Sequence, residues 1–253
     1  MCGIYGIIDK SEIRLDDFTL GLKTLDKRGP DNNGYKLIKP NLIFGHTRLS
    51  IIDIDKKSNQ PFSNDENYWL TFNGEIYNYK ELKEELVSLG YKFKTQSDTE
   101  VLLNSYKHWG ETCVNHFNGM WSFALYDVKK EKLFCSRDRF GIKPFYYTFV
   151  NGVFIFSSNI KAILAYQPNL KVPNFEALDE YILRGNTGSS EMTWFKNIKR
   201  LQPSNNLIFH EEFLKTINYY TLNFKKTKDD FNSAKINFKN LLFDAVKLRL
   251  RSD

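Results

Sequence analysis

The stretch MCGIYGII (residues 1–8) is the one on which the fold assignment depends. Its β-branched and aromatic residues predict a strand that begins almost at the terminus. Cys2 follows the initiator methionine, and removal of that methionine would make Cys2 the first residue. A cysteine in that place has a thiol and a free α-amine, which can accept a proton near neutral pH. The stretch therefore predicts a nucleophile with its own general base, although taken alone it also fits an ordinary buried cysteine.

Outward from this strand, the chain alternates between strand and helix patterns. Strands are predicted in 41–51, 68–77 and 91–95, and helices in 78–90 and 97–110, the second with Ser97 and Glu100 in a capping box. Two hairpins follow in 120–138 and 145–158, and the Asn-Gly pair at 151–152 suits the tight turn of the second. Further helices are predicted in 157–166, 175–183 and 231–251, whereas 185–225 reads as a loop-rich connector. This order predicts two antiparallel sheets with helices outside them.

Composition excludes several classes of protein. No apolar run approaches the roughly 18 residues of a membrane helix, and no secretory segment begins the chain, so we expect a cytoplasmic protein without membrane contact. The net charge is +6, but the lysines are scattered among acids, which favours a solvated surface over nucleic-acid binding. The three cysteines are far apart, and the four histidines show no metal-ligand spacing.

Two further motifs carry groups that suit a thiol nucleophile. In FNGEIYN (72–78), Asn73 offers a side-chain amide and Gly74 an unobstructed backbone N–H, which are the donors that an oxyanion needs. Arg48 and Asp98 could bind the α-carboxylate and α-ammonium of an amino acid. Each also has an ordinary explanation, since Asn-Gly favours turns and an acid in a first helical turn complements the helix dipole.

Six motifs in order over about 150 residues form a specific combination. They resemble the class II glutamine amidotransferases, and most of all the glutaminase domain of glutamine-dependent asparagine synthetase: CGIYGII (2–8), RGPDNNG (28–34), GHTRLSIID (45–53), NGEIYNYKEL (73–82), SDTEVLL (97–103) and RDRFGIKPFYY (137–147).

The resemblance implies an α+β fold, the four-layer αββα sandwich of N-terminal-nucleophile hydrolases, with a C-terminal helix from the start of a second domain. It implies that Cys2 is the nucleophile, that its α-amine is the base, and that Asn73 and Gly74 hold the oxyanion. The positions that it implies for glutamine binding are Arg48, Leu49, Ser50, Ile51, Ile52, Asn73, Gly74, Glu75 and Asp98.

The implied reaction is hydrolysis of glutamine to glutamate and ammonia through a γ-glutamyl thioester. No metal or organic cofactor is implied for this half-reaction. The ammonia is destined for an ATP-activated acceptor, with aspartate as the leading candidate. ATP and Mg are expected only for a synthetase domain that this sequence lacks. The expected partners are L-glutamine, a synthetase domain or subunit, and a second copy of the chain in a homodimer.

The expected organisation is a glutaminase domain in 1–190, a connector in 191–222 and the truncated start of an ATP-pyrophosphatase domain in 223–253. The Ser-Gly-Gly-x-Asp-Ser signature of that second domain is absent. Two alternatives stay open. The chain could be a catalytically silent domain that regulates or binds a partner. Its ammonia could also go to a sugar acid, because Asn159 and RLQPSNN (200–206) depart from the residues that are usual in the family.

Overall fold

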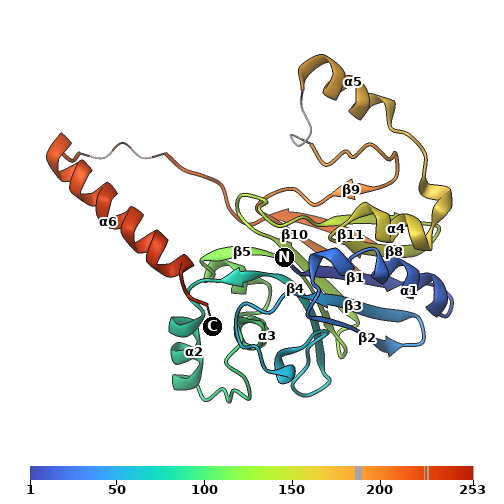
Figure 1. Ribbon diagram of the computed structural model, residues 1–253, viewed down its shortest axis with the longest axis horizontal. Coiled ribbons are helices and arrows are strands. Elements are labelled where there is room, and N and C mark those ends of the chain that lie inside the picture. Colours follow the sequence, from blue (N-terminus) through green and yellow to red (C-terminus); the bar gives the residue numbers. More distant parts are fainter. Residues whose placement is uncertain (186–189, 225, 227, 253) are drawn as a thin grey trace.

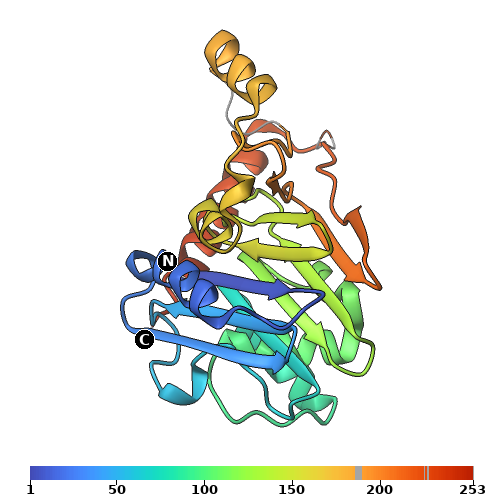
Figure 2. The same ribbon diagram turned by 90° about the vertical axis from the view of Figure 1, so that its right-hand side faces the viewer.

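Two antiparallel sheets lie face to face between helices in the computed structural model, which describes residues 1–185, 190–224, 226 and 228–252 (Figures 1 and 2). The six-stranded sheet has the spatial order β2 (Asn32–Lys39), β3 (Leu42–Arg48), β1 (Gly3–Ile8), β8 (Val153–Ser157), β7 (Tyr146–Val150) and β9 (Lys199–Arg200). The five-stranded sheet has the order β11 (Phe213–Asn218), β10 (Asn205–His210), β6 (Lys132–Arg137), β5 (Gly119–Asp127) and β4 (Tyr68–Ile76).

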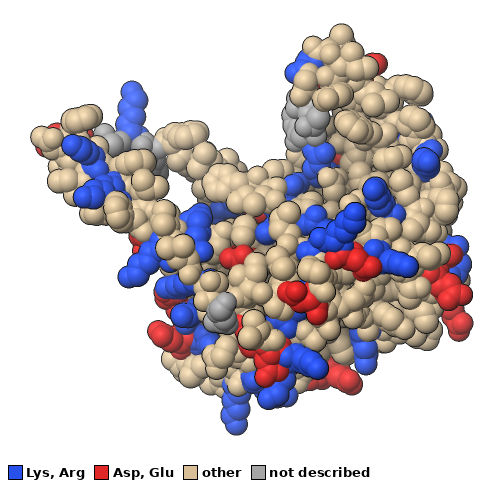
Figure 3. Space-filling view, viewed as in Figure 1, with Lys and Arg blue, Asp and Glu red and all other residues tan. Residues whose placement is uncertain are grey.

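Each sheet has helices on its outer face, which confirms the predicted αββα sandwich. The six-stranded sheet is covered by α1 (Leu15–Lys23) and α4 (Ile160–Tyr166), which contact each other, and the five-stranded sheet by α2 (Tyr79–Ser88) and α3 (Asp98–Trp109) (Figure 1). Two more helices, α5 (Phe175–Arg184) and α6 (Phe231–Arg249), project from the sandwich. In the face shown in Figure 3, acidic and basic side chains are intermingled over the sandwich.

The core has three apolar layers, as a four-layer sandwich requires. The central layer lies between the sheets and is rich in phenylalanine, including Phe44 and Phe156, whose rings meet edge to face with centroids 5.4 Å apart. The outer layers join α2 and α3 to one sheet and α1 and α4 to the other. Because β1 lies between β3 and β8, the residue before β1 is held at the end of an interior strand.

Several predicted elements are confirmed with small shifts of their ends: the first strand, the strands of 41–51 and 68–77, both hairpins and the predicted helices. Asn151 and Gly152 have φ values of 54° and 75°, as the tight turn between β7 and β8 requires. The C-terminal helix is also present, but none of its residues is buried.

The predicted strand in 91–95 is wrong. Its residues join neither sheet, and the backbone N–H groups of Lys94 and Thr95 donate instead to the Glu100 carboxylate, with Thr95 at 2.7 Å. Glu100 therefore does not complete the predicted capping box. Ser97 does cap α3, since its hydroxyl accepts the N–H of Thr99 at 3.1 Å.

The loop-rich interpretation of residues 185–225 is also wrong for part of its length. Within this range, β10 pairs with β6 and with β11, and β9 pairs with β7. Residues 186–189 and 225 of the range lie outside the described part of the chain. Two further elements, α1 and β2, were not predicted from the sequence. Whether the domain boundaries lie at 190 and 222 stays a prediction.

Candidate active site

Cys2 lies where the start of β1 meets the end of β3. Gly3 pairs with Thr47, so the antiparallel register brings the residues after Thr47 beside Cys2. The backbone N–H of Leu49 donates to the Cys2 sulfur at 3.3 Å, and the thiol faces the Leu49 carbonyl at 3.6 Å. Arg28 Nε donates to the Cys2 carbonyl oxygen at 3.0 Å. The predicted nucleophile is therefore fixed on both its backbone and its side chain.

Burial shifts the two titratable groups at this end of the chain in opposite directions. It raises the pKa of the Cys2 thiol, and the Leu49 hydrogen bond opposes this rise. It lowers the pKa of the α-amine, which in this structure belongs to Met1, from 8.0. The thiol thus keeps its proton more firmly than an exposed cysteine would, while the amine is biased toward the neutral form that accepts a proton.

Gly74 lies on β4, the edge strand of its sheet. Leu70, Phe72 and Ile76 donate their backbone N–H groups away from β5, to groups outside the sheet. Backbone groups of an antiparallel strand alternate in direction, so the N–H of Gly74 points the same way. No side chain fits there, because a Cβ on Gly74 would lie 2.2 Å from the Met120 carbonyl oxygen.

Asn73 has the amide that the sequence analysis assigned to the oxyanion. Its side chain lines the same cavity as Cys2 and is only 1% exposed. Neither its Nδ2 nor its Oδ1 has a hydrogen-bond partner among the described residues. A buried amide without partners costs free energy, so this group is expected to have a partner when the cavity is filled.

Asp98 and Glu75 place two carboxyl groups in the cavity wall. Asp98 begins α3, and its Oδ2 accepts the N–H of Ile76 at 3.0 Å, which joins α3 to the end of β4. Burial raises the pKa of Asp98 to about 7 despite this hydrogen bond. Burial also raises the pKa of Glu75, and Lys143 opposes that rise.

Arg48 ends β3, and its guanidinium shapes the loop that follows. Its Nη1 donates to the Asp55 carbonyl at 3.0 Å and to Asn59 Oδ1 at 2.6 Å, and its Nη2 donates to the carbonyl oxygens of Asp53 and Ile52. Arg48 therefore faces the cavity with both terminal nitrogens already engaged, and its predicted contact with a carboxylate stays a prediction.

The predicted residues converge on one cavity of about 200 Å³. Of the predicted set, only Ser50 does not line it, because its backbone N–H donates to Asp31 Oδ2 at 2.7 Å outside the cavity. Sequence reasoning missed other lining residues. The polar ones are Ser58, Gln60, Ser97, Thr99 and Lys143.

Two of these residues differ in whether the sequence pointed to them. Lys143 lies inside the motif RDRFGIKPFYY, which indicated the family but assigned no role to the lysine. Gln60 lies in a loop without a recognisable pattern, and its Oε1 accepts the N–H of Phe72 at 2.6 Å.

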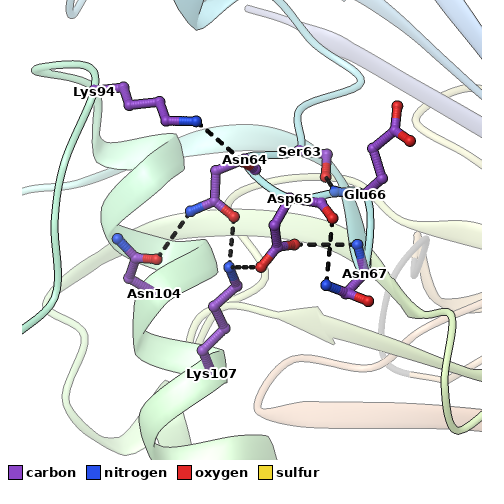
Figure 4. Close-up of polar contacts among 8 residues, drawn as sticks. All are labelled: Ser63, Asn64, Asp65, Glu66, Asn67, Lys94, Asn104 and Lys107. Carbon is purple, nitrogen blue, oxygen red and sulfur yellow. Dashed lines mark hydrogen bonds and ion pairs between the residues drawn. The ribbon is translucent and has the colours of Figure 1, made fainter.

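A polar cluster fixes the loop that leads into β4 (Figure 4). Lys107 of α3 forms an ion pair with Asp65 at 2.6 Å and also donates to Asn64 Oδ1. The Asn64 side chain donates to Asn104 Oδ1 at 3.2 Å, and Lys94 Nζ donates to the Asn64 carbonyl at 3.2 Å. These contacts tie the loop before β4 to α3 and to Lys94, which precedes that helix.

In the part of the chain that the structure describes, no group of three or more His, Cys, Asp or Glu side chains is arranged to hold a metal ion. No helix there is both long and apolar enough to cross a membrane.

Comparison with known proteins gives one family. The model of the glutamine amidotransferase domain matches residues 1–220. The chain is 38% identical over 260 residues to asparagine synthetase (glutamine-hydrolyzing) 3 of Bacillus subtilis, covering 100% of this chain and 42% of that protein. It is 35% identical over 260 residues to asparagine synthetase (glutamine-hydrolyzing) 1 of the same organism, covering 100% and 40%. The chain thus spans less than half the length of these relatives.

A solved structure supports the fold. The glutamine phosphoribosylpyrophosphate amidotransferase of Bacillus subtilis, complexed with ADP and GMP, superposes with a TM-score of 0.65 at 19% identity. The match covers 87% of this chain and 50% of that one. At this identity the likeness concerns the arrangement of the sheets and helices alone.

Proposed function

The chain belongs to the class II glutamine amidotransferase family, and we propose that it hydrolyses the side-chain amide of L-glutamine with Cys2 as the nucleophile. One observation carries this proposal: the Cys2 thiol shares a cavity with the Asn73 amide, and neither atom of that buried amide has a partner among the described residues. A structural asparagine would use its hydrogen bonds within the fold. An oxyanion donor must keep them free for the substrate.

The proposed reaction starts once Met1 has been removed and the α-amine belongs to Cys2. The amine takes the thiol proton, the sulfur attacks the amide carbon, and the resulting oxyanion accepts hydrogen bonds from Asn73 Nδ2 and the Gly74 N–H. The ammonium returns its proton to the leaving nitrogen, the C–N bond breaks and ammonia departs. Water then attacks the thioester with the amine as base, the C–S bond breaks, and glutamate is released.

Recognition of the rest of glutamine is proposed for the polar wall of the cavity. Asp98 and Glu75 suit the α-ammonium, and a cation beside the Asp98 carboxyl would lower the pKa that burial has raised. Arg48 lines the cavity beside the loop that follows β3, and it supplies positive charge for the α-carboxylate. The backbone of Leu49 to Ile52 completes the wall on that side, and only Ser50 of this segment does not line the cavity.

We also propose that the ammonia is used by a synthetase domain or subunit. The names of the two Bacillus subtilis relatives support asparagine synthesis, with aspartate as the ATP-activated acceptor. ATP and Mg would belong to that synthetase part, and the hydrolysis proposed here uses only groups of this chain and water. We likewise propose that two copies of the chain form a homodimer.

The proposal is tested by labelling with a diazoketone analogue of glutamine. Protein shown by intact mass to lack Met1 is incubated with the analogue, and the adduct is mapped by peptide mass spectrometry. We expect one adduct on Cys2, no adduct in Cys2→Ala, and glutamate release from glutamine by the parent alone. Absence of an adduct on correctly processed protein would contradict the proposal and favour a catalytically silent domain.

A further inference from the structure

Lys143 is a buried cation whose ammonium has no partner in the described part of the chain. It is 5% exposed and lines the cavity together with Cys2 and Glu75. Neither a hydrogen bond nor an ion pair to its Nζ occurs among the described residues. The ammonium nitrogen is not among the fully buried polar atoms without a partner, so it faces the cavity and not the apolar core. A largely buried charge without a protein partner is still costly. A lysine kept in this state therefore needs an explanation in what the cavity does.

The backbone at Lys143 is held firmly by two buried ions. The Asp138 carboxylate accepts the N–H groups of Phe140, Ile142 and Lys143, at 3.1, 2.9 and 3.0 Å. Arg137 donates from Nε to the Lys143 carbonyl at 2.7 Å. These bonds fix the turn after β6 and therefore the point from which the Lys143 side chain enters the cavity.

The charge of Lys143 acts on both titratable groups of the predicted nucleophile. Its positive charge lowers the pKa of the Cys2 thiol, because a cation favours a neighbouring thiolate. It also lowers the pKa of the α-amine at this end of the chain, which in this structure belongs to Met1, because two cations repel each other. Burial lowers the pKa of Lys143 itself, and Glu75 and Cys2 oppose that effect. The charge of Lys143 thus offsets part of the effect of burial on the thiol and adds to the effect of burial on the amine.

We propose that Lys143 is a positioning residue whose positive charge, set in the same cavity as Cys2, stabilises the thiolate that forms when the Cys2 proton passes to the amine. This inference rests on the proposed function, since it assigns a role within the same site. Lys143 would act through charge on Cys2 and its amine, without a bond to the substrate. The charged or titratable groups that face Cys2 and the amine are Arg28, Asp31, Glu75, Asp98 and Lys143.

The test measures the reactivity of the thiol directly. Protein without Met1 is alkylated with iodoacetamide over a range of pH, and the rate at Cys2 is followed by peptide mass spectrometry. Lys143→Met should raise the midpoint of the rate profile by about one pH unit, so the rate below the midpoint falls roughly tenfold. Lys143→Arg should restore the parental midpoint.

Two matched controls separate this role from a general loss of charge or of structure. Lys161→Met removes the same charge from an exposed position on α4 and should leave the midpoint unchanged. Asp98→Asn should shift it the opposite way, because the Asp98 carboxylate raises the pKa of Cys2. Cys113 and Cys135 are fully buried and serve as internal markers of folding, since alkylation there reports unfolding.

An unchanged midpoint in folded Lys143→Met would overturn the inference, as would a higher KM for glutamine with a parental alkylation profile. If the methionine variant does not fold, Lys143→Gln is measured in its place. The alkylation needs no glutamine, so it tests the role of Lys143 even if the proposed function is wrong. The two failures can therefore be told apart. If the proposed function is wrong, the parent releases no glutamate, and the effect of Lys143 on the Cys2 thiol is still measured.

Discussion

At the scale of single residues, the Asn73 amide combines burial with an absence of partners. Because Asn73→Ala removes no hydrogen bond within the described fold, we expect the free energy of unfolding to change by less than about 1 kcal/mol. Turnover of glutamine should fall roughly 10²–10³-fold, the usual cost of losing one oxyanion donor. Denaturant unfolding and a glutaminase assay on the same preparation check both values. A large loss of stability with normal turnover would make Asn73 a structural residue.

The buried Asp98 carboxyl makes the stability of the protein depend on pH. Burial raises its pKa from 3.8 to about 7, so between these values the folded protein keeps a proton that the unfolded chain has released. Stability from this group is therefore greatest at low pH and is lost as pH rises toward 7. Asp98→Asn cannot ionise, so its stability relative to the parent should increase by up to about 4 kcal/mol between roughly pH 4 and pH 8. Urea unfolding across this range measures the difference.

The same variant has a second readout in binding. Asp98→Asn should raise KM for glutamine much more than it lowers kcat, because an amide pairs poorly with the substrate ammonium. Equal pH profiles of stability for variant and parent would contradict the raised pKa. An unchanged KM would contradict the contact with the ammonium.

At the scale of elements, close approach of β4 and β5 depends on glycine. A Cβ on Gly119 would lie 2.2 Å from the Glu75 carbonyl oxygen, which is backbone and cannot move aside cheaply. We expect Gly119→Ala to lower the free energy of unfolding by about 3 kcal/mol. Gly90→Ala is the matched control: Gly90 has a φ of 91° with nothing within 4 Å of its Cβ position, so only backbone strain of about 1–2 kcal/mol is expected. Equal losses in the two variants would contradict the steric explanation.

The elements that sequence predicted best are those whose local pattern agrees with their environment. The turn at Asn151–Gly152 needs positive φ, and both residues tolerate it. The predicted strand in 91–95 failed because the Glu100 carboxylate takes the N–H groups that a strand would have donated to a sheet. β10 and β11 were missed because they follow Pro203 and carry several polar residues, while β6, with which β10 pairs, lies far away in the sequence.

The site was predictable where its residues belong to a sequence motif. Cys2, Asn73, Gly74 and Asp98 reach one cavity, as the order of motifs implied. Gln60 was not predictable, because it enters the cavity through a bond to the edge of β4 that only the tertiary structure creates.

At the scale of the whole molecule, α6 stands apart from the sandwich. None of its residues is buried, and the helix stands away from the sheets (Figure 1). Two contacts hold its C-terminal end: Arg251, just after the helix, pairs with Glu81 of α2 at 2.6 Å, and Arg249 lies over the ring of Tyr77, just before α2. We expect its amide hydrogens to exchange far faster than those of β1 and β5, because helical stability in proteins comes mainly from packing. Hydrogen exchange followed by mass spectrometry on monomeric protein tests this. Protection equal to that of β5 would show that α6 packs against something in solution.

The edge of β4 has a consequence beyond catalysis. Open backbone groups on an edge strand can recruit strands from other chains and start aggregation. Here the Gln60 side chain and the His46 ring occupy the N–H and carbonyl of Phe72, and the Asp98 carboxylate occupies the N–H of Ile76. The bonds that shape the cavity are therefore also a guard against self-association. Variants at Gln60 or His46 should therefore aggregate, as inclusion bodies or fibrils, and this loss of soluble protein should be larger than any change in the rate of glutamine hydrolysis.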